Sequence, residues 1–115
     1  MKKIAIVAYT DEIGTFIDAL QSGLEKRKNG DDVKLIIEGN ATHYLKDISK
    51  SDEKYKKIFE TARKNGLIDC VCETCSKKTN TIDYAKNQGL HLSGESYGHP
   101  SLFNYSRVGY EIIYF

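Results

Sequence analysis

The chain has 115 residues, of which 40% are hydrophobic and 29% are charged, which is the composition of an ordinary globular protein. Its formal net charge of +1 gives no reason to expect nucleic acid or an anionic membrane as a partner. No apolar stretch approaches the ~18 residues that a membrane helix needs. We therefore expect a single domain over residues 1–115, large enough to bury a core, without nucleic-acid or membrane partners.

The N-terminal third of the chain has the pattern of a strand, a helix and a second strand. Lys3 to Tyr9 is apolar and β-branched without alternation, as in a strand buried on both faces of a parallel sheet. This run is too short for a secretory signal and lacks a plausible cleavage site. Thr10-Asp11 offers capping side chains for a helix from about Glu12 to Lys28. Val33 to Ile37 is the expected second strand.

The rest of the chain continues to alternate between helical and strand patterns. We expect helices over about 41–48, 51–65, 79–88 and 101–107, with Pro100 in the first position of the last one. Strands are expected over about 67–72, 89–93 and 110–115. This alternation predicts a three-layer α/β/α sandwich with about five mainly parallel strands and right-handed crossovers.

Parallel sheets of this kind place their functional crevice beyond the carboxyl ends of the strands. The loops at that edge would be Thr10-Asp11, Gly39-Asn40, Cys72 to Cys75 and Gly94 to His99. The topology therefore predicts that a pair of thiols and a histidine face one crevice, although some distance separates them in sequence.

All three cysteines of the protein, Cys70, Cys72 and Cys75, fall within six positions of one another. Cys72 and Cys75 form a Cys-x-x-Cys where a strand ends and a helix begins. The partial positive charge of a helix N-terminus, with two nearby lysines, favours thiolate, so we expect a lowered cysteine pKa there. Cys70 lies inside the apolar run and is interpreted as a core residue. Clustered cysteines without a disulfide framework indicate a reducing cytoplasm.

Three residues are candidates for catalysis: Cys72, Cys75 and His99. Cys72 ends its strand and should point into the crevice, where its thiolate could attack a persulfide and carry the outer sulfur onward. Cys75 lies one helical turn later and could act as the resolving thiol. His99 could stabilise the thiolate or move a proton, although it could also cap the following helix. His91 sits in an expected strand and is interpreted as structural.

Other uses of these residues stay open. Zinc or iron could bind Cys72, Cys75 and His99, with Cys70 or His43 as a further ligand, but the spacing beyond the first pair matches no standard zinc module. The cysteines could also be buried in a non-catalytic assembly subunit. A nucleotide site is disfavoured, because the segment after the first strand lacks the glycine pattern and carries acidic residues that repel phosphate.

Several segments together resemble the DsrE-like family (DsrE, DsrF and TusD-like proteins) of small cytoplasmic sulfur-relay proteins. They are Lys3 to Tyr9, Ile36 to Gly39, Gly66 to Cys75, Gly89 to Leu92, Gly98 to Ser101 and Gly109 to Ile113. The resemblance implies an α/β/α fold that assembles as a homotrimer or hexamer and exchanges sulfur with donor and acceptor proteins.

In sulfur-carrying members of the family, a cysteine at the end of the third long strand accepts the persulfide. By position this cysteine is Cys72. Those members commonly have one such cysteine, whereas this chain adds Cys75 and Cys70. The resemblance therefore predicts a cytoplasmic sulfur carrier without a cofactor, and the extra thiols leave transfer, dithiol redox chemistry and metal binding as alternatives.

Overall fold

The computed structural model describes residues 1–115 and contains one five-stranded sheet in the order β4-β3-β2-β1-β5. All neighbouring strands run parallel. The strands are β1 (Lys3–Ala8), β2 (Asp32–Ile37), β3 (Ile68–Cys72), β4 (Leu92–Ser93) and β5 (Glu111–Tyr114). The helices are α1 (Ile13–Lys28), α2 (Tyr44–Asp47), α3 (Glu53–Lys64), α4 (Glu73–Lys78), α5 (Ile82–Asn87) and α6 (Leu102–Arg107), with 3-10 turns η1 (Gly39–His43) and η2 (Ile48–Lys50).

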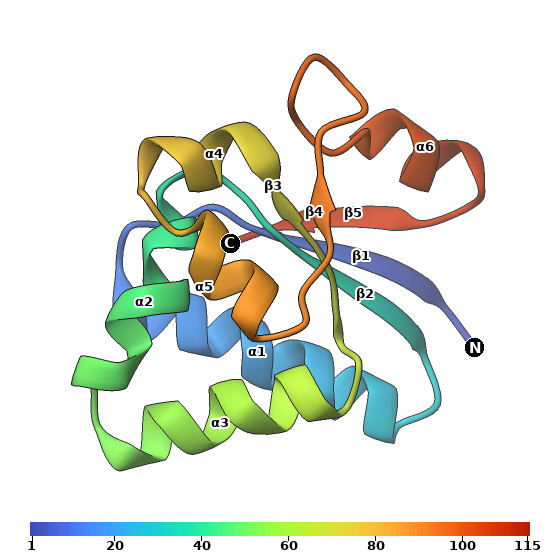
Figure 1. The fold of residues 1–115 in the computed structure, drawn as a ribbon. Coiled ribbons are helices and arrows are strands. Elements are labelled where there is room, and N and C mark those ends of the chain that lie inside the picture. Colours follow the sequence, from blue (N-terminus) through green and yellow to red (C-terminus); the bar gives the residue numbers. More distant parts are fainter.

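One face of the sheet is covered by α1, α3 and α5, which lie together below the strands in Figure 1. This face holds a core of 20 buried residues. Because side chains alternate along a strand, Ile4 and Ile6 of β1 point into this core while Ala5 and Val7 point the other way. Phe16 of α1 anchors the core, with its ring stacked on Tyr44 at 5.0 Å.

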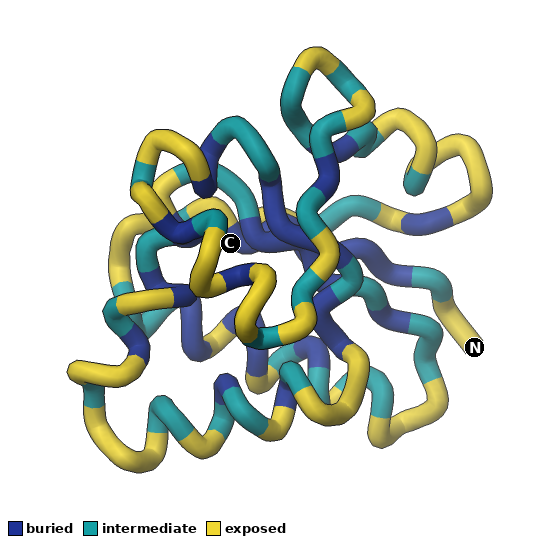
Figure 2. Tube along the Cα trace, in the orientation of Figure 1, coloured by how far each residue is buried: buried dark blue, intermediate teal, exposed yellow.

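The opposite face is covered only by α6 and the loop that leads into it (Figure 1). Five buried residues form the core there: Ala5, Val7, Ile36, Cys70 and Tyr110. The helix α6 has no fully buried residue, and its trace is exposed or intermediate in Figure 2. The three-layer α/β/α sandwich is therefore confirmed, with a third layer one short helix thick. No helix is both long and apolar enough to cross a membrane.

Helices α1 and α6 begin within one residue of the expected positions, but the residues expected at their N-termini are wrong. Helix α1 is capped by Glu12, whose carboxylate accepts the backbone N–H groups of Gly14 at 2.7 Å and Thr15 at 2.9 Å. Thr10-Asp11 does not cap it. Helix α6 begins after Ser101, whose hydroxyl accepts the N–H of Asn104 at 3.3 Å, so Pro100 precedes the cap.

Three other elements are shorter or more broken than expected. The segment expected as one helix over 41–48 begins and ends in 3-10 turns, with only 44–47 as α-helix. Helix α5 starts at Ile82, because Asn80 adopts a left-handed φ of 59° that interrupts the helical run. Strand β4 is limited to two residues, since it pairs only with Val71 and Cys72.

Candidate thiol and histidine site

A cavity of about 530 Å³ opens on the α6 face of the sheet at the carboxyl ends of the strands. Its walls come from β1, β2, β5, α4, α6 and the loop before α6: Val7, Tyr9, Glu38, Gly39, Cys75, His99, Leu102 and Tyr114. The cavity lies where strand order changes direction, between β1 and β5. A cavity is thus present at the predicted edge of the sheet and is lined by Cys75 and His99, but neither Cys72 nor the Thr10-Asp11 loop lines it.

Cys72 and Cys75 are positioned by the junction of β3 and α4. Cys72 is the last residue of β3 and also the residue that caps α4. Its sulfur accepts the backbone N–H of Cys75 at 3.3 Å, which satisfies one of the free amides of the helix N-terminus. One helical turn therefore holds the two cysteines next to each other.

His99 completes a cluster with the two thiols. Its Nδ1 lies 3.2 Å from the Cys72 sulfur and 3.8 Å from the Cys75 sulfur. These three atoms, which could together ligate a metal ion, all lie within 4.8 Å of one another. The structure therefore brings together the three residues that the sequence singled out, and Cys70 and His43 are not part of this group.

The loop that carries His99 is tied to the start of α4. The N–H of Thr74 donates to the carbonyl of Gly98 at 3.0 Å. Gly98 has a φ of +90°, and a Cβ there would clash with the hydroxyl of Thr74. Glycine is thus required at this position, because only glycine combines this backbone conformation with such close contact to α4. Consequently His99 is held against the thiols by backbone contacts.

The exposure of the two thiols differs from what the strand pattern predicts. Cys72 was expected to point into the crevice, but it is fully buried at 0% exposure. Cys75 is 8% exposed and lines the cavity. An incoming molecule in the cavity therefore meets Cys75 first, and Cys72 lies behind it.

The expected lowering of the Cys72 pKa is wrong. Burial, followed by the hydrogen bond with the Cys75 thiol, raises the pKa of Cys72 to about 12. The N–H of Cys75 favours the thiolate, but desolvation outweighs this contribution of the helix N-terminus. Desolvation therefore opposes ionisation of Cys72, and a group that takes its proton is needed before it can act as a nucleophile.

Cys70 is a core residue, as its place in the apolar run predicts. It is 3% exposed on the α6 face, and its sulfur lies 3.4 Å from the hydroxyl of Tyr105. Burial raises the pKa of Cys70 to about 11. The same hydroxyl donates to Asp69, so Cys70 belongs to a separate polar cluster beneath α6.

Glu38 is a member of the site that was not singled out from the sequence. It follows β2 directly, and its Oε1 lies 3.7 Å from His99 Nδ1. Burial raises the pKa of Glu38, while the charge of His99 acts in the opposite direction. The sequence position of Glu38 could have identified it, because it directly precedes Gly39, which is expected at the carboxyl edge of the sheet.

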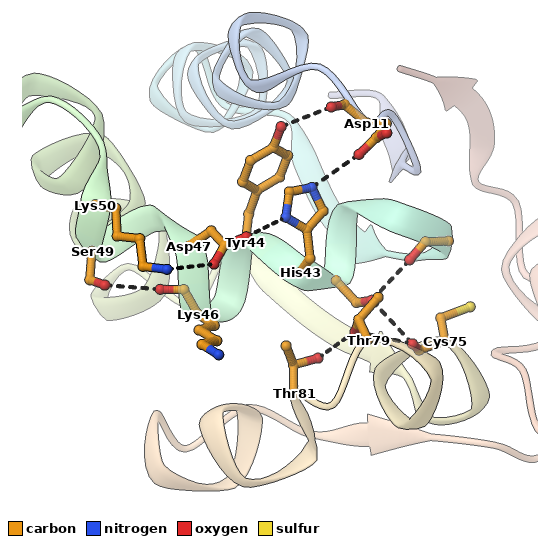
Figure 3. A network of polar contacts seen from close by, with 12 residues as sticks. Asp11, His43, Tyr44, Lys46, Asp47, Ser49, Lys50, Cys75, Thr79 and Thr81 are labelled. Carbon is orange, nitrogen blue, oxygen red and sulfur yellow. Dashed lines mark hydrogen bonds and ion pairs between the residues drawn. The ribbon is translucent and has the colours of Figure 1, made fainter.

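A group of threonine hydroxyls surrounds the backbone carbonyl of Cys75 (Figure 3). Thr42 and Thr79 donate to the carbonyl of Cys75 at 3.3 and 3.2 Å, and their hydroxyls lie 2.8 Å apart. Thr81 joins the group at 2.9 Å from Thr79. Because Thr42 is fully buried, this group fixes the first turn of α4 against η1.

The other two histidines lie outside the site. His43 places Nδ1 2.8 Å from Asp47 and Nε2 3.1 Å from Asp11, so both ring nitrogens are engaged away from the thiols (Figure 3). Together with the bond from the Tyr44 hydroxyl to the Asp11 carbonyl at 2.9 Å, this contact ties Asp11 to η1 and α2. His91 lies just before β4 and not in a strand, and its side chain is exposed and makes no hydrogen bond. Only its backbone carbonyl takes part in the fold, by accepting the N–H of Val71 at 2.8 Å.

Comparison with known proteins gives one solved structure and one sequence relative of interest, and no family model matches the chain. The solved structure is a conserved protein of unknown function, BT1422, from Bacteroides thetaiotaomicron. It superposes with a TM-score of 0.77 over 99% of this chain and 95% of its own, at 16% sequence identity. At this identity the match establishes the fold alone.

The sequence relative is the uncharacterized protein MJ0733 of Methanocaldococcus jannaschii. It is 35% identical over 89 residues, which span 77% of this chain and 70% of MJ0733. Identity of this extent reflects common descent, and therefore the chain belongs to the same family as MJ0733.

Proposed function

We propose that this protein is a sulfur carrier that accepts sulfane sulfur as a cysteine persulfide in the cavity at the carboxyl edge of the sheet. The observation that carries the proposal is a thiol, Cys75, that lines the cavity beside a second thiol and the imidazole of His99. The resemblance to DsrE-like proteins supports the same chemistry. We assign the receiving role to Cys75, because Cys72 is fully buried.

Acceptance of sulfur needs only groups that the site contains. The Cys75 thiolate attacks the outer sulfur of a donor persulfide; a new S–S bond forms, the donor's S–S bond breaks, and the donor leaves as a thiolate. His99, with Nδ1 3.8 Å from the Cys75 sulfur, takes the thiol proton and returns it to the departing thiolate. Val7 and Leu102 give the cavity an apolar wall beside Cys75.

The test is consumption of a persulfide donor by the reduced protein under anaerobic conditions. Wild type should consume one equivalent of a small-molecule persulfide per chain, measured as loss of sulfane sulfur from the donor. Cys75→Ser should abolish consumption, whereas Cys70→Ser, the matched control beneath α6, should leave it unchanged. Consumption by Cys75→Ser at the wild-type rate would contradict the assignment, and no consumption by any variant would refute the function.

A second candidate function is metal binding by Cys72, Cys75 and His99. Zn–S bonds of ~2.3 Å and Zn–N bonds of ~2.1 Å at a tetrahedral angle place nitrogen and sulfur ligands ~3.6 Å apart. The two N···S distances, 3.2 and 3.8 Å, bracket this value. Glu38, 3.7 Å from His99 Nδ1, is the nearest candidate for a fourth ligand. The ligand types suit zinc or iron.

Cobalt(II) provides a direct test of this second function. A tetrahedral thiolate site should give sulfur-to-cobalt charge-transfer absorption at one ion per chain, and zinc should displace the cobalt. Cys75→Ser should remove the absorption, while Cys70→Ser should retain it. Absence of the band in wild type would exclude the site.

A further inference from the structure

We propose that the paired thiols make the protein a sulfide-releasing persulfide reductase, in which Cys72 displaces hydrosulfide from persulfidated Cys75. This inference rests on the sulfur-accepting function proposed above and goes beyond carriage. A carrier with a single cysteine holds its persulfide until an acceptor arrives. In this chain a second thiol lies beside the receiving thiol, so the persulfide has an internal reaction partner.

The burial of the two sulfurs separates their roles. Cys75 lines the cavity and is reached from outside, whereas Cys72 is fully buried behind it. The Cys72 sulfur therefore cannot meet an external donor, but it lies within 4.8 Å of the Cys75 sulfur. The hydrogen bond from the N–H of Cys75 to the Cys72 sulfur, at 3.3 Å, fixes the two residues relative to each other. Attack between groups held this close proceeds without the entropic cost of a bimolecular encounter.

The step balances without an external oxidant. The Cys72 thiolate attacks the Cys75 sulfur of the persulfide, an S–S bond forms between Cys72 and Cys75, and the bond to the outer sulfur breaks. The outer sulfur leaves as hydrosulfide and becomes hydrogen sulfide on protonation. The sulfane sulfur gains two electrons, and the two cysteine sulfurs supply them as they become a disulfide. A dithiol reductant then restores the two thiols for another cycle.

His99 is placed to move the proton that this step releases. Its Nδ1 lies 3.2 Å from the Cys72 sulfur and 3.8 Å from the Cys75 sulfur, so one nitrogen faces both the attacking and the leaving side. An unprotonated Nδ1 takes the proton from Cys72 and passes it to the departing hydrosulfide. Cys70 cannot replace Cys72, because it lies outside this group of atoms and packs against Tyr105.

The experiment follows the fate of the sulfur after one equivalent of persulfide donor is added to reduced protein without oxygen or reductant. A sulfide-selective electrode measures released sulfide, and intact mass spectrometry measures the protein. Wild type should release one sulfide per chain and lose the mass of two hydrogen atoms, with peptide mapping showing a bond between Cys72 and Cys75. Cys72→Ser should release none and retain the mass of one added sulfur atom on Cys75.

The outcomes separate this inference from the function on which it rests. Wild type that keeps the added sulfur and releases no sulfide would overturn the reductase step while leaving sulfur carriage intact. Failure of every variant to consume the donor would instead refute carriage itself. Sulfide release by Cys72→Ser at the wild-type rate would also overturn the step. If the serine variant does not fold, Cys72→Ala replaces it. If neither variant folds, peptide mapping of the wild type is decisive: absence of a bond between Cys72 and Cys75 after addition of the donor would overturn the step.

Discussion

The two faces of the sheet are built from the same strands but differ in what they bury. The face under α1, α3 and α5 holds a core of 20 buried residues, whereas the face under α6 holds five and opens into the cavity at the carboxyl edge. Cys70 belongs to the α6 face, and Cys72, two residues along the same strand, lies on the same side. The α1 face therefore provides most of the stability of the fold, whereas the thinly covered α6 face holds the cavity with the candidate site.

The largest expected effect is the loss of stability when a side chain is truncated in the core of 20 residues under α1, α3 and α5. Phe16→Ala should lower the free energy of unfolding by about 3–5 kcal/mol, because the ring is fully buried between Tyr44 and Phe59. Urea denaturation measures this loss. The matched control on α6 is Phe103→Ala, which removes a ring that is 72% exposed and should change stability by less than about 0.5 kcal/mol. Equal losses of unfolding free energy in the two variants would contradict the proposal that the α1 face provides most of the stability.

The next effect is a difference in reactivity between two thiols, Cys75 and Cys70. Cys75 should react with iodoacetamide at neutral pH at least about tenfold faster than Cys70, because Cys75 lines the cavity while Cys70 is buried with a pKa of about 11. Since only the thiolate reacts, alkylation of Cys70 should accelerate as pH rises towards 11. Peptide mass spectrometry over time measures each rate. Equal reactivity in the folded protein would contradict the assigned burial.

A smaller effect is expected from the hydroxyls that join the site to η1. Thr42→Val keeps the shape of a fully buried side chain but removes the contacts of its hydroxyl with Thr79 and with the carbonyls of Gly39 and Cys75, which should cost about 1 kcal/mol. Thr61→Val, on the exposed surface of α3, should cost less than about 0.5 kcal/mol. Chemical denaturation of both variants measures the difference in the free energy of unfolding. If Thr42→Val unfolds with the same free energy as wild type, the hydroxyl group does not stabilise α4.

The smallest effect is the pH dependence contributed by the cap of α1. Hydrogen bonds from Thr15 and Gly14 hold the pKa of Glu12 below its ordinary value. A carboxyl group whose pKa is lower in the folded state stabilises the protein above its unfolded pKa, and this contribution is lost as pH falls through the folded pKa. Glu12→Gln should therefore destabilise the protein at pH 7 and converge with wild type in acid. A constant difference at all pH values would contradict the capping role of the charge.

The sheet could be predicted from the sequence because its strands are apolar runs separated by helical periodicity. β1 and β3 were placed correctly to within one residue at each end. The Cys-x-x-Cys and His99 were also singled out, since both follow strands at the carboxyl edge. Local sequence patterns are sufficient for such predictions, because they reflect contacts within an element and the parallel order of the strands.

The exposure and charge of the site could not be predicted in the same way. Whether Cys72 or Cys75 faces the cavity depends on how α4 and the loop at Gly98 pack over the sheet, which no local pattern encodes. The pKa of Cys72 is a balance between the helix N-terminus and desolvation, and the degree of burial decides it. Glu38 becomes part of the site only through its distance to His99.

The contact between Thr74 and Gly98 has a practical consequence for following the site in solution. Tyr97, the residue before Gly98, is fully exposed at the tip of the loop that α4 holds in place. Because the chain contains no tryptophan, Tyr97→Trp would install a single fluorophore whose emission could be read without interference from other indole groups. Disulfide closure or metal capture at the base of α4 would then be visible as an optical signal from the surface, without a chemical label.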